Sequence, residues 1–150
     1  MSTTWEIEAA AIAALKPKHV LFLCVANSAR SQLAEGIARS LAPTGVKVSS
    51  AGSAPSRLNP LAVKVLAELG LDISAQYSKR VEDIPPDDVD VVVTLCAEEV
   101  CPVFLGKAMR VHWGLPDPAG ATGDERVKLE AFRAVRDELR RRLAVVFFKP

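Results

Sequence analysis

Four short segments of the chain place apolar residues either in succession or in alternation with polar ones, at positions 19–24, 46–51, 89–95 and 109–113. The stretches between them space their apolar residues differently. Runs of this length are typical of strands, and the run at 89–95, almost unbroken apart from one aspartate, indicates a strand buried on both faces. The sequence therefore predicts four strands.

The stretches between these runs carry apolar residues three and four positions apart, which is helical spacing. One helix is predicted directly after Ser31, one opens at 59–60 and stops before Gly70, and a long one closes the chain from 125 to about 145. Strands that alternate with helices predict an α/β fold. We expect a single three-layer domain, with a central parallel four-stranded sheet and helices on both faces.

The segment before the first strand has its own pattern. Its apolar residues at helical spacing are Trp5, Ala9, Ile12 and Leu15. Pro17 then ends the segment. We expect a short helical N-terminal extension over residues 1–17, without a catalytic role, and the main domain over residues 18–150.

Composition excludes several classes of function. The formal net charge is +1 and aromatic residues make up 5% of the chain, so neither charge nor base stacking favours nucleic acid or an anionic membrane. No apolar run approaches the roughly 20 residues of a membrane span, and no secretory signal pattern is present. Three cysteines, an odd number, do not suggest a disulfide framework for export. We expect a cytoplasmic, monomeric enzyme whose cysteines act chemically.

The first predicted strand ends on Cys24, and a loop of small and polar residues leads from it into the next helix. Backbone N–H groups in such a loop converge on one point, where the helix dipole adds partial positive charge. A thiol there is favoured as the nucleophilic thiolate, and the guanidinium of Arg30 offers paired donors to a tetrahedral oxyanion. The predicted oxyanion-binding residues are Val25, Ala26, Asn27, Ser28, Ala29, Arg30 and Ser31.

The spacing of Cys24 and Arg30 is a loose pattern on its own, and it also fits a buried cysteine at a strand end. The context favours function, because a strand precedes the loop and a helix follows it. The hydroxyl of Ser31 can bond either the thiolate or an N–H of the first helical turn.

Two more loops follow strands and should lie at the same edge of the sheet. The loop after the fourth strand contains Asp117 between Pro116 and Pro118. Prolines stiffen its backbone, so Asp117 can serve as a general acid above the oxyanion site. Asp-Pro is also common in turns and helix caps. The neighbouring cysteine loop favours the acid.

The loop after the third strand contains Cys96 and Cys101. On a regular helix their side chains would point about 140° apart, so a bond between them requires an unwound loop. A structural thiol and a metal pair are the alternatives. The metal reading is weak because His19 and His112 lack ligand-like spacing to the cysteines, and we expect no metal.

Together, residues 24–31, Asp117 with Pro118 and the cysteine pair resemble the thioredoxin-coupled arsenate reductases, which have the low-molecular-weight protein tyrosine phosphatase fold. The similarity runs from about residue 18 to the C-terminal helix. The phosphate-binding loop is shared with the phosphatases, whereas the paired cysteines are typical of the reductases. Further matching segments are 51–53, 59–60, 93–96, 101–102 and 112–114.

The resemblance implies a three-cysteine mechanism for reducing arsenate to arsenite, without a cofactor. The Cys24 thiolate attacks arsenate, which Arg30 and the loop amides hold, and Asp117 protonates the departing hydroxide. Cys96 then attacks the Cys24 sulfur, releasing arsenite, and Cys101 forms a disulfide with Cys96 that thioredoxin reduces. Phosphate and sulfate would mimic the substrate.

Two features depart from the family. Only four residues separate Cys96 from Cys101, fewer than in the members we compare it with. Some members bind potassium through residues that match Asn27, Glu35, Ser50 and an acidic residue after a serine. Here Lys79 follows that serine, so its ammonium group can take the cation's place. We predict activity that is independent of potassium.

Three other functions remain open. A tyrosine or aryl phosphatase would use Cys24, Arg30 and Asp117, but one tyrosine and two tryptophans offer few aromatic walls for a phosphotyrosine pocket. A reductase coupled to a small thiol or glutaredoxin would not need Cys101. A thiol redox sensor, or an oxyanion-binding protein without turnover, would not need Asp117.

Overall fold

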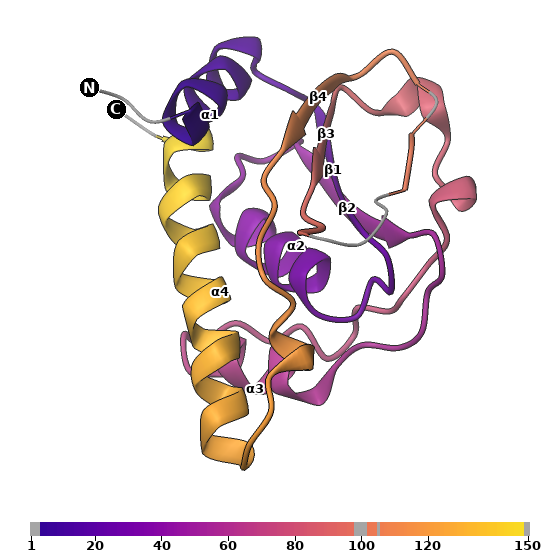
Figure 1. Cartoon of the computed structure of the whole chain (residues 1–150). Coiled ribbons are helices and arrows are strands. Elements are labelled where there is room, and N and C mark those ends of the chain that lie inside the picture. The colour runs from indigo at the N-terminus through magenta and orange to yellow at the C-terminus, as the bar shows by residue number, and fades with distance from the viewer. Residues whose placement is uncertain (1–3, 98–101, 105, 149–150) are drawn as a thin grey trace.

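The computed structural model describes residues 4–97, 102–104 and 106–148. Within them, four parallel strands form one sheet in the order β2-β1-β3-β4 (Figure 1). The strands are β1 (His19–Cys24), β2 (Lys47–Gly52), β3 (Val91–Thr94) and β4 (Met109–His112). All four predicted strands are confirmed, with ends that differ from the predicted bounds by at most two residues.

The helices begin and end at residues whose chemistry explains their bounds. Asn59 caps its helix by accepting a hydrogen bond from the Leu61 N–H at 2.8 Å, and Asp124 does the same for the Val127 N–H at 3.1 Å. The chain turns away after the first of these helices at Gly70, whose φ of 76° favours glycine. The α-helices are α1 (Thr4–Leu15), α2 (Arg30–Leu41), α3 (Pro60–Ala67) and α4 (Glu125–Val146), and the 3-10 helices are η1 (Val81–Asp83), η2 (Pro86–Asp88) and η3 (Pro118–Gly120).

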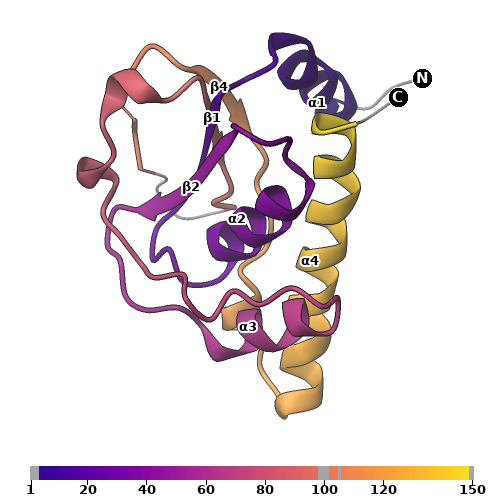
Figure 2. The same ribbon diagram turned by 180° about the vertical axis from the view of Figure 1, so that it is seen from behind.

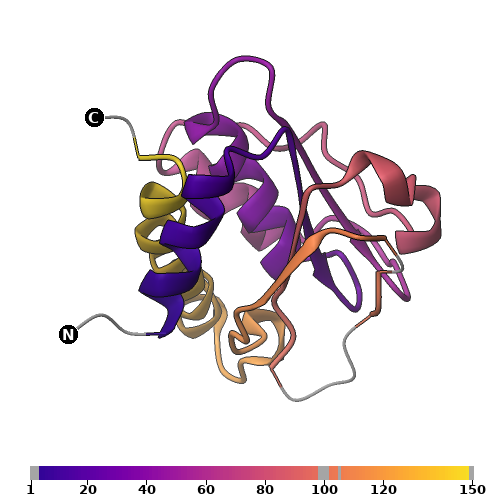
Figure 3. The same cartoon turned by 90° about the horizontal axis from the view of Figure 1, so that it is seen from above.

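The two faces of the sheet are covered differently. The α-helices gather over one face, where α2 and α3 both contact α4 and α1 lies against the far end of α4 (Figures 2 and 3). Val20 and Phe22 of β1 point to this side, whereas Leu21 and Leu23 join a second cluster with Val81. That second side is covered by η1, η2 and the segment around residue 104. The predicted α/β fold is confirmed, with 3-10 helices forming the second outer layer.

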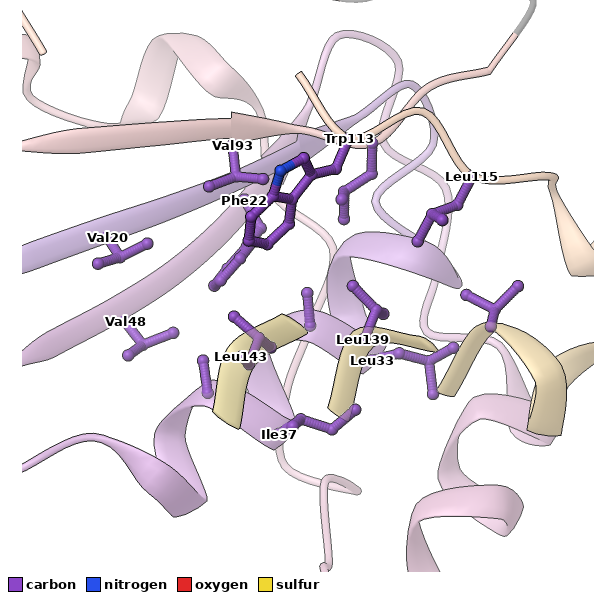
Figure 4. Close-up of a cluster of buried hydrophobic side chains, with 14 of the residues drawn as sticks. Val20, Phe22, Leu33, Ile37, Val48, Val93, Trp113, Leu115, Leu139 and Leu143 are labelled. Carbon is purple, nitrogen blue, oxygen red and sulfur yellow. The ribbon is translucent and has the colours of Figure 1, made fainter. Parts of the chain in front are cut away.

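The larger core lies between the sheet and the α-helices. Trp113, directly after β4, packs beside Phe22 and faces Leu143 of α4 (Figure 4). Leu33 and Ile37 of α2 belong to the same cluster. This packing fixes the start of the chain segment that runs from β4 to η3. In the part of the chain that the structure describes, no helix combines the length and apolar character needed to cross a bilayer.

The register of the strands aligns the loops that carry the chemistry. Leu23 of β1 pairs with Thr94 of β3, and Thr94 pairs with His112 of β4. Cys24 ends β1 and Cys96 lies two positions beyond β3, so both are at the same edge of the sheet. The loop leading to Asp117 leaves from this edge as well.

Candidate active site

The loop between β1 and α2 is held from outside by its backbone carbonyls. The carbonyls of Val25, Ala26 and Ser28 accept hydrogen bonds of 2.9–3.0 Å from amides of the segment 54–59. The Asn27 carbonyl accepts from Gln32 Nε2 at 2.9 Å and from a serine hydroxyl at 2.7 Å. When successive carbonyls face outward, the N–H groups of a tight loop face inward. Inward N–H groups are the arrangement that an anion site requires.

Glycine at the end of β2 allows this loop to pass close by. A Cβ on Gly52 would lie 2.3 Å from the Val25 carbonyl oxygen and 2.8 Å from that of Cys24. Both atoms belong to the backbone, so a side chain here would displace the loop. Gly52 and Gln32 are two supports that the motif did not indicate. Gln32 is fully buried in α2 beside other buried polar residues, and the sequence held no signal that marked it.

Cys24 lies at the mouth of the loop and is 2% exposed. Its Sγ is 2.8 Å from the hydroxyl oxygen of Ser31, in the first turn of α2. Asn27 Nδ2 donates to the same oxygen at 2.8 Å, which leaves the Ser31 hydroxyl proton available to point at the sulfur. A donor aimed at Sγ stabilises the thiolate. Of the two bonds open to Ser31, the structure contains the one to the thiol.

A buried polar network supports Asn27 from the opposite side. Its backbone adopts a φ of 48°, and its Nδ2 also donates to Ser50 Oγ at 2.9 Å. Ser50 donates in turn to Glu35 Oε1 at 2.6 Å. The ammonium of Lys79 lies 3.7 Å from this carboxylate oxygen, and the Lys79 N–H donates to Asn27 Oδ1 at 2.9 Å. Lys79, whose ammonium group was expected to take the place of a cation, therefore contacts the Glu35 carboxylate.

Arg30 connects the loop to the two other strand ends. It is 4% exposed, and its Nη1 donates to the Leu115 carbonyl at 3.0 Å and to the Leu95 carbonyl at 3.4 Å. Its Nη2 lies 4.0 Å from Asp117 Oδ2. Arg30 thus brings together the segments that carry Cys96 and Asp117. Its guanidinium has five N–H donors in a planar fork, which suits both carbonyls and an oxyanion.

Asp117 caps a helix, and its second carboxylate oxygen is turned toward Arg30. Its Oδ1 accepts the Ala119 N–H at 3.0 Å and so caps η3. Its Oδ2 is directed toward Arg30, and the side chain is 45% exposed. One carboxylate oxygen fixes the side chain while the other is accessible for proton transfer.

The two remaining cysteines differ in what the structure describes. Cys96 is 1% exposed and follows Leu95, whose N–H donates to the Leu23 carbonyl at 2.9 Å. It therefore lies two positions beyond β3, the strand that neighbours β1. Cys101 lies outside the described residues, and with it the expected bond to Cys96.

The histidines have structural partners. His19 Nε2 is 2.8 Å from Ser49 Oγ and Nδ1 is 3.2 Å from the Asp88 carbonyl. Burial, followed by the positive charge of Lys47, lowers the pKa of His19 below its usual 6.5. His112 Nδ1 is 2.7 Å from Thr94 Oγ1. Among residues 4–97, 102–104 and 106–148, no cluster of ligand side chains forms a metal site.

Comparison with known proteins points to one family. The sequence model of the low molecular weight phosphotyrosine protein phosphatases matches residues 19–148. An arsenate reductase of Bacillus subtilis is 44% identical over 131 residues, which cover 86% of this chain and 94% of the relative. A solved arsenate reductase in an oxidized state is 36% identical, with a TM-score of 0.74 over 87% of this chain and 96% of its own.

Two further relatives differ in the reductant named for them. A glutaredoxin arsenate reductase of Synechocystis is 38% identical over 84% of this chain and 93% of its own. A thioredoxin-dependent arsenate reductase of Corynebacterium glutamicum is 29% identical, with a TM-score of 0.60 over 91% of this chain and 67% of its own.

Proposed function

The chain belongs to the low molecular weight phosphotyrosine protein phosphatase family, and on this premise we propose that it reduces arsenate to arsenite through a relay of three cysteines. The observation that carries the proposal is the pair of cysteines at neighbouring strand ends. Cys24 in the anion loop is the nucleophile that a phosphatase also needs. A second buried cysteine, Cys96, beyond the adjacent strand end is what a reductase needs in addition.

In the first step the Cys24 thiolate attacks arsenic(V), which is held by the loop amides and Arg30. The bond from arsenic to one hydroxyl breaks, and Asp117 supplies the proton so that the group leaves as water. The contact between Ser31 and Sγ supports this role for Cys24, because it places a hydroxyl within hydrogen-bond distance of the attacking sulfur. Arg30 then stabilises the charge that gathers on the arsenate oxygens.

In the second step the Cys96 thiolate attacks the sulfur of Cys24. A sulfur–sulfur bond forms, the sulfur–arsenic bond breaks, and its electron pair remains on arsenic, which leaves as arsenite. Arsenic is reduced by two electrons and the two thiols are oxidised to a disulfide. Attack by Cys101 on Cys96 then returns Cys24 to the thiolate.

We propose thioredoxin as the reductant of the resulting disulfide. Cys101 supports this choice, since a glutaredoxin or small-thiol enzyme can act without a third cysteine. The relay requires the reducing conditions of the cytoplasm. We propose that the enzyme acts as a monomer, which sedimentation of the reduced protein would test.

Arsenate-dependent oxidation of NADPH with thioredoxin and thioredoxin reductase tests the proposal. Wild type should turn over repeatedly, and Cys24→Ser, Cys96→Ser and Cys101→Ser should each abolish repeated turnover. Sustained activity of Cys101→Ser would instead show that the reductant attacks a Cys24–Cys96 disulfide directly.

Phosphatase activity is the second candidate, because Cys24, Arg30 and Asp117 have the geometry that phosphoryl transfer also uses. Phosphate and arsenate share charge and shape, so we expect weak hydrolysis of aryl phosphates that survives Cys96→Ser. A wild type that is inert with arsenate yet hydrolyses aryl phosphates efficiently would replace the reductase proposal.

A further inference from the structure

Helix α1 precedes the region that the family model matches, which begins at residue 19, yet it is packed into the domain. Ala9 and Ile12 are buried, and α1 lies side by side with the C-terminal end of α4 (Figures 1 and 3). The ring of Trp5 has the guanidinium groups of Arg141 and Arg142 at 5.3 and 5.4 Å from its centre. Cation–π contacts of this kind fasten α1 to α4.

One side chain of α1 reaches across to the segment after β4. Trp113 Nε1 donates to Glu8 Oε1 at 3.2 Å, and Arg142 lies 5.5 Å from the centre of the Trp113 ring. Trp113 is 2% exposed. A buried indole N–H without an acceptor is costly, so Glu8 is the group that allows the ring to sit at this depth.

Trp113 in turn begins the segment that carries the proposed acid. The backbone N–H of Trp113 donates to the Thr94 carbonyl at 2.8 Å. Two residues later, the backbone N–H of Leu115 donates to the Leu95 carbonyl at 3.1 Å. The Leu115 carbonyl then accepts from Arg30, and Asp117 follows at 4.0 Å from the same guanidinium. Only Gly114 and Pro116 separate these fixed points. A displacement of the indole is therefore passed along four residues to the carboxylate.

We propose that Glu8 is a positioning residue of the active site, and that α1 is a brace that holds the segment 113–117 at the distance from Cys24 that proton transfer needs. The inference rests on the role of Asp117 in the proposed function. Glu8 does not touch the reacting atoms; it acts through Trp113. Small misplacements of a catalytic group lower its rate contribution steeply, which gives the brace a kinetic effect beyond its effect on stability.

Glu8→Ala, with Glu8→Gln and Glu130→Ala beside it, tests the proposal in the full chain. Glu8→Gln keeps an oxygen acceptor for the indole, and Glu130→Ala removes an exposed carboxylate that pairs with Arg133 on α4. We expect Glu8→Ala to lower kcat for arsenate about fivefold with little change in KM, the size expected for one lost hydrogen bond. Glu8→Gln should recover most of the rate, and Glu130→Ala should match wild type.

A double variant separates positioning from general stability. In the background Asp117→Asn, adding Glu8→Ala should lower kcat no further. The acid that Glu8 positions is already replaced by an amide that cannot protonate the leaving group. Equal fold losses in both backgrounds would show that Glu8 acts elsewhere and would overturn the proposal.

Amide hydrogen exchange supplies a readout that does not depend on arsenate. Exchange in peptides covering 113–121 should accelerate in Glu8→Ala but not in Glu130→Ala, while β1 stays protected. Unchanged exchange there would overturn the brace, whatever the activity. If wild type does not reduce arsenate but the exchange changes as expected, the proposed function fails and the brace stands as a structural contact to that segment.

Discussion

Replacing Lys79 with glutamine tests whether the fixed ammonium group serves the oxyanion loop. The Lys79 ammonium lies 3.7 Å from Glu35 Oε1, and the two side chains are 17% and 4% exposed. Glu35 accepts from Ser50, which accepts from Asn27, the residue whose left-handed backbone shapes the loop. Removing the cation leaves a buried carboxylate with less compensation.

The size of the effect follows from the distance. Two unit charges at 3.7 Å attract by about 4–5 kcal/mol at an effective dielectric constant of 20. Desolvation opposes this attraction, and Arg39 still pairs with Glu35 at 2.6 Å, so the expected net loss of unfolding free energy is about 2 kcal/mol. For a chain of 150 residues, that loss lowers Tm by about 4–8 °C.

Thermal unfolding and arsenate turnover should be measured in potassium, sodium and a bulky organic cation. Wild type should give the same Tm and rate in all three, since Lys79 already supplies the charge. The Lys79→Gln variant should melt lower and regain part of its stability in potassium only. Lys64→Gln is the matched control: its partner Glu125 lies 3.5 Å away but both side chains are exposed, so Tm should hardly change.

Two outcomes would refute this reasoning. If Lys79→Gln has the same Tm as wild type, the ion pair between Lys79 and Glu35 does not stabilise the fold. If wild type turns over markedly faster in potassium than in the organic cation, the ammonium does not replace the ion.

Three further predictions concern single side chains. Asp117→Asn should slow turnover about 100-fold or more while phosphate still binds, and an unchanged rate would remove Asp117 from the mechanism. Burial lowers the pKa of His19 below 6.5, so His19 binds a proton at a higher pH in the unfolded chain than in the folded one. The free energy of unfolding should therefore fall as the pH drops below 6.5. His19→Gln should flatten this part of the curve of Tm against pH; parallel curves would contradict the assignment. Gly52→Ala should cost at least about tenfold in rate and lower Tm, because its Cβ would press on the Val25 carbonyl, whereas Gly120→Ala, which meets nothing within 4 Å, should keep the wild-type Tm.

Local patterns were sufficient to predict the sheet and the position of its loops. The run at 19–24 has six buried residues in succession, and strands of this kind stand out from their surroundings. The covering of the second face was harder to predict. It depends on Val81, Ile84 and Phe104, which lie in 3-10 turns and loops too short to show a period.

The candidate site shows the same limit. Three residues could be predicted from their positions: Cys24 ends a strand, Arg30 begins a helix and Asp117 lies in the loop after a strand. Such positions meet at one edge of a parallel sheet. The contacts that tie them together join residues far apart in sequence: Arg30 bonds the carbonyls of Leu95 and Leu115, which no side-chain motif encodes. The pairing of Glu8 with Trp113 spans 105 positions and is likewise invisible before folding.

In the functions that we propose, the same anion loop serves two chemistries, and the residue that distinguishes them follows the neighbouring strand. In the proposed mechanism, Cys24 attacks either a phosphoryl or an arsenyl centre held by Arg30, with Ser31 bonded to its sulfur, because both centres present a tetrahedral oxyanion. A phosphorus–sulfur intermediate must be resolved by water, since phosphorus(V) is not readily reduced. An arsenic(V) thiolate can instead give up its sulfur to a second thiol, provided that one is within reach. Cys96, buried just beyond the end of the strand that pairs with β1, is the residue that we propose for this role. Activity with arsenate should therefore depend on Cys96, and activity with aryl phosphates should not.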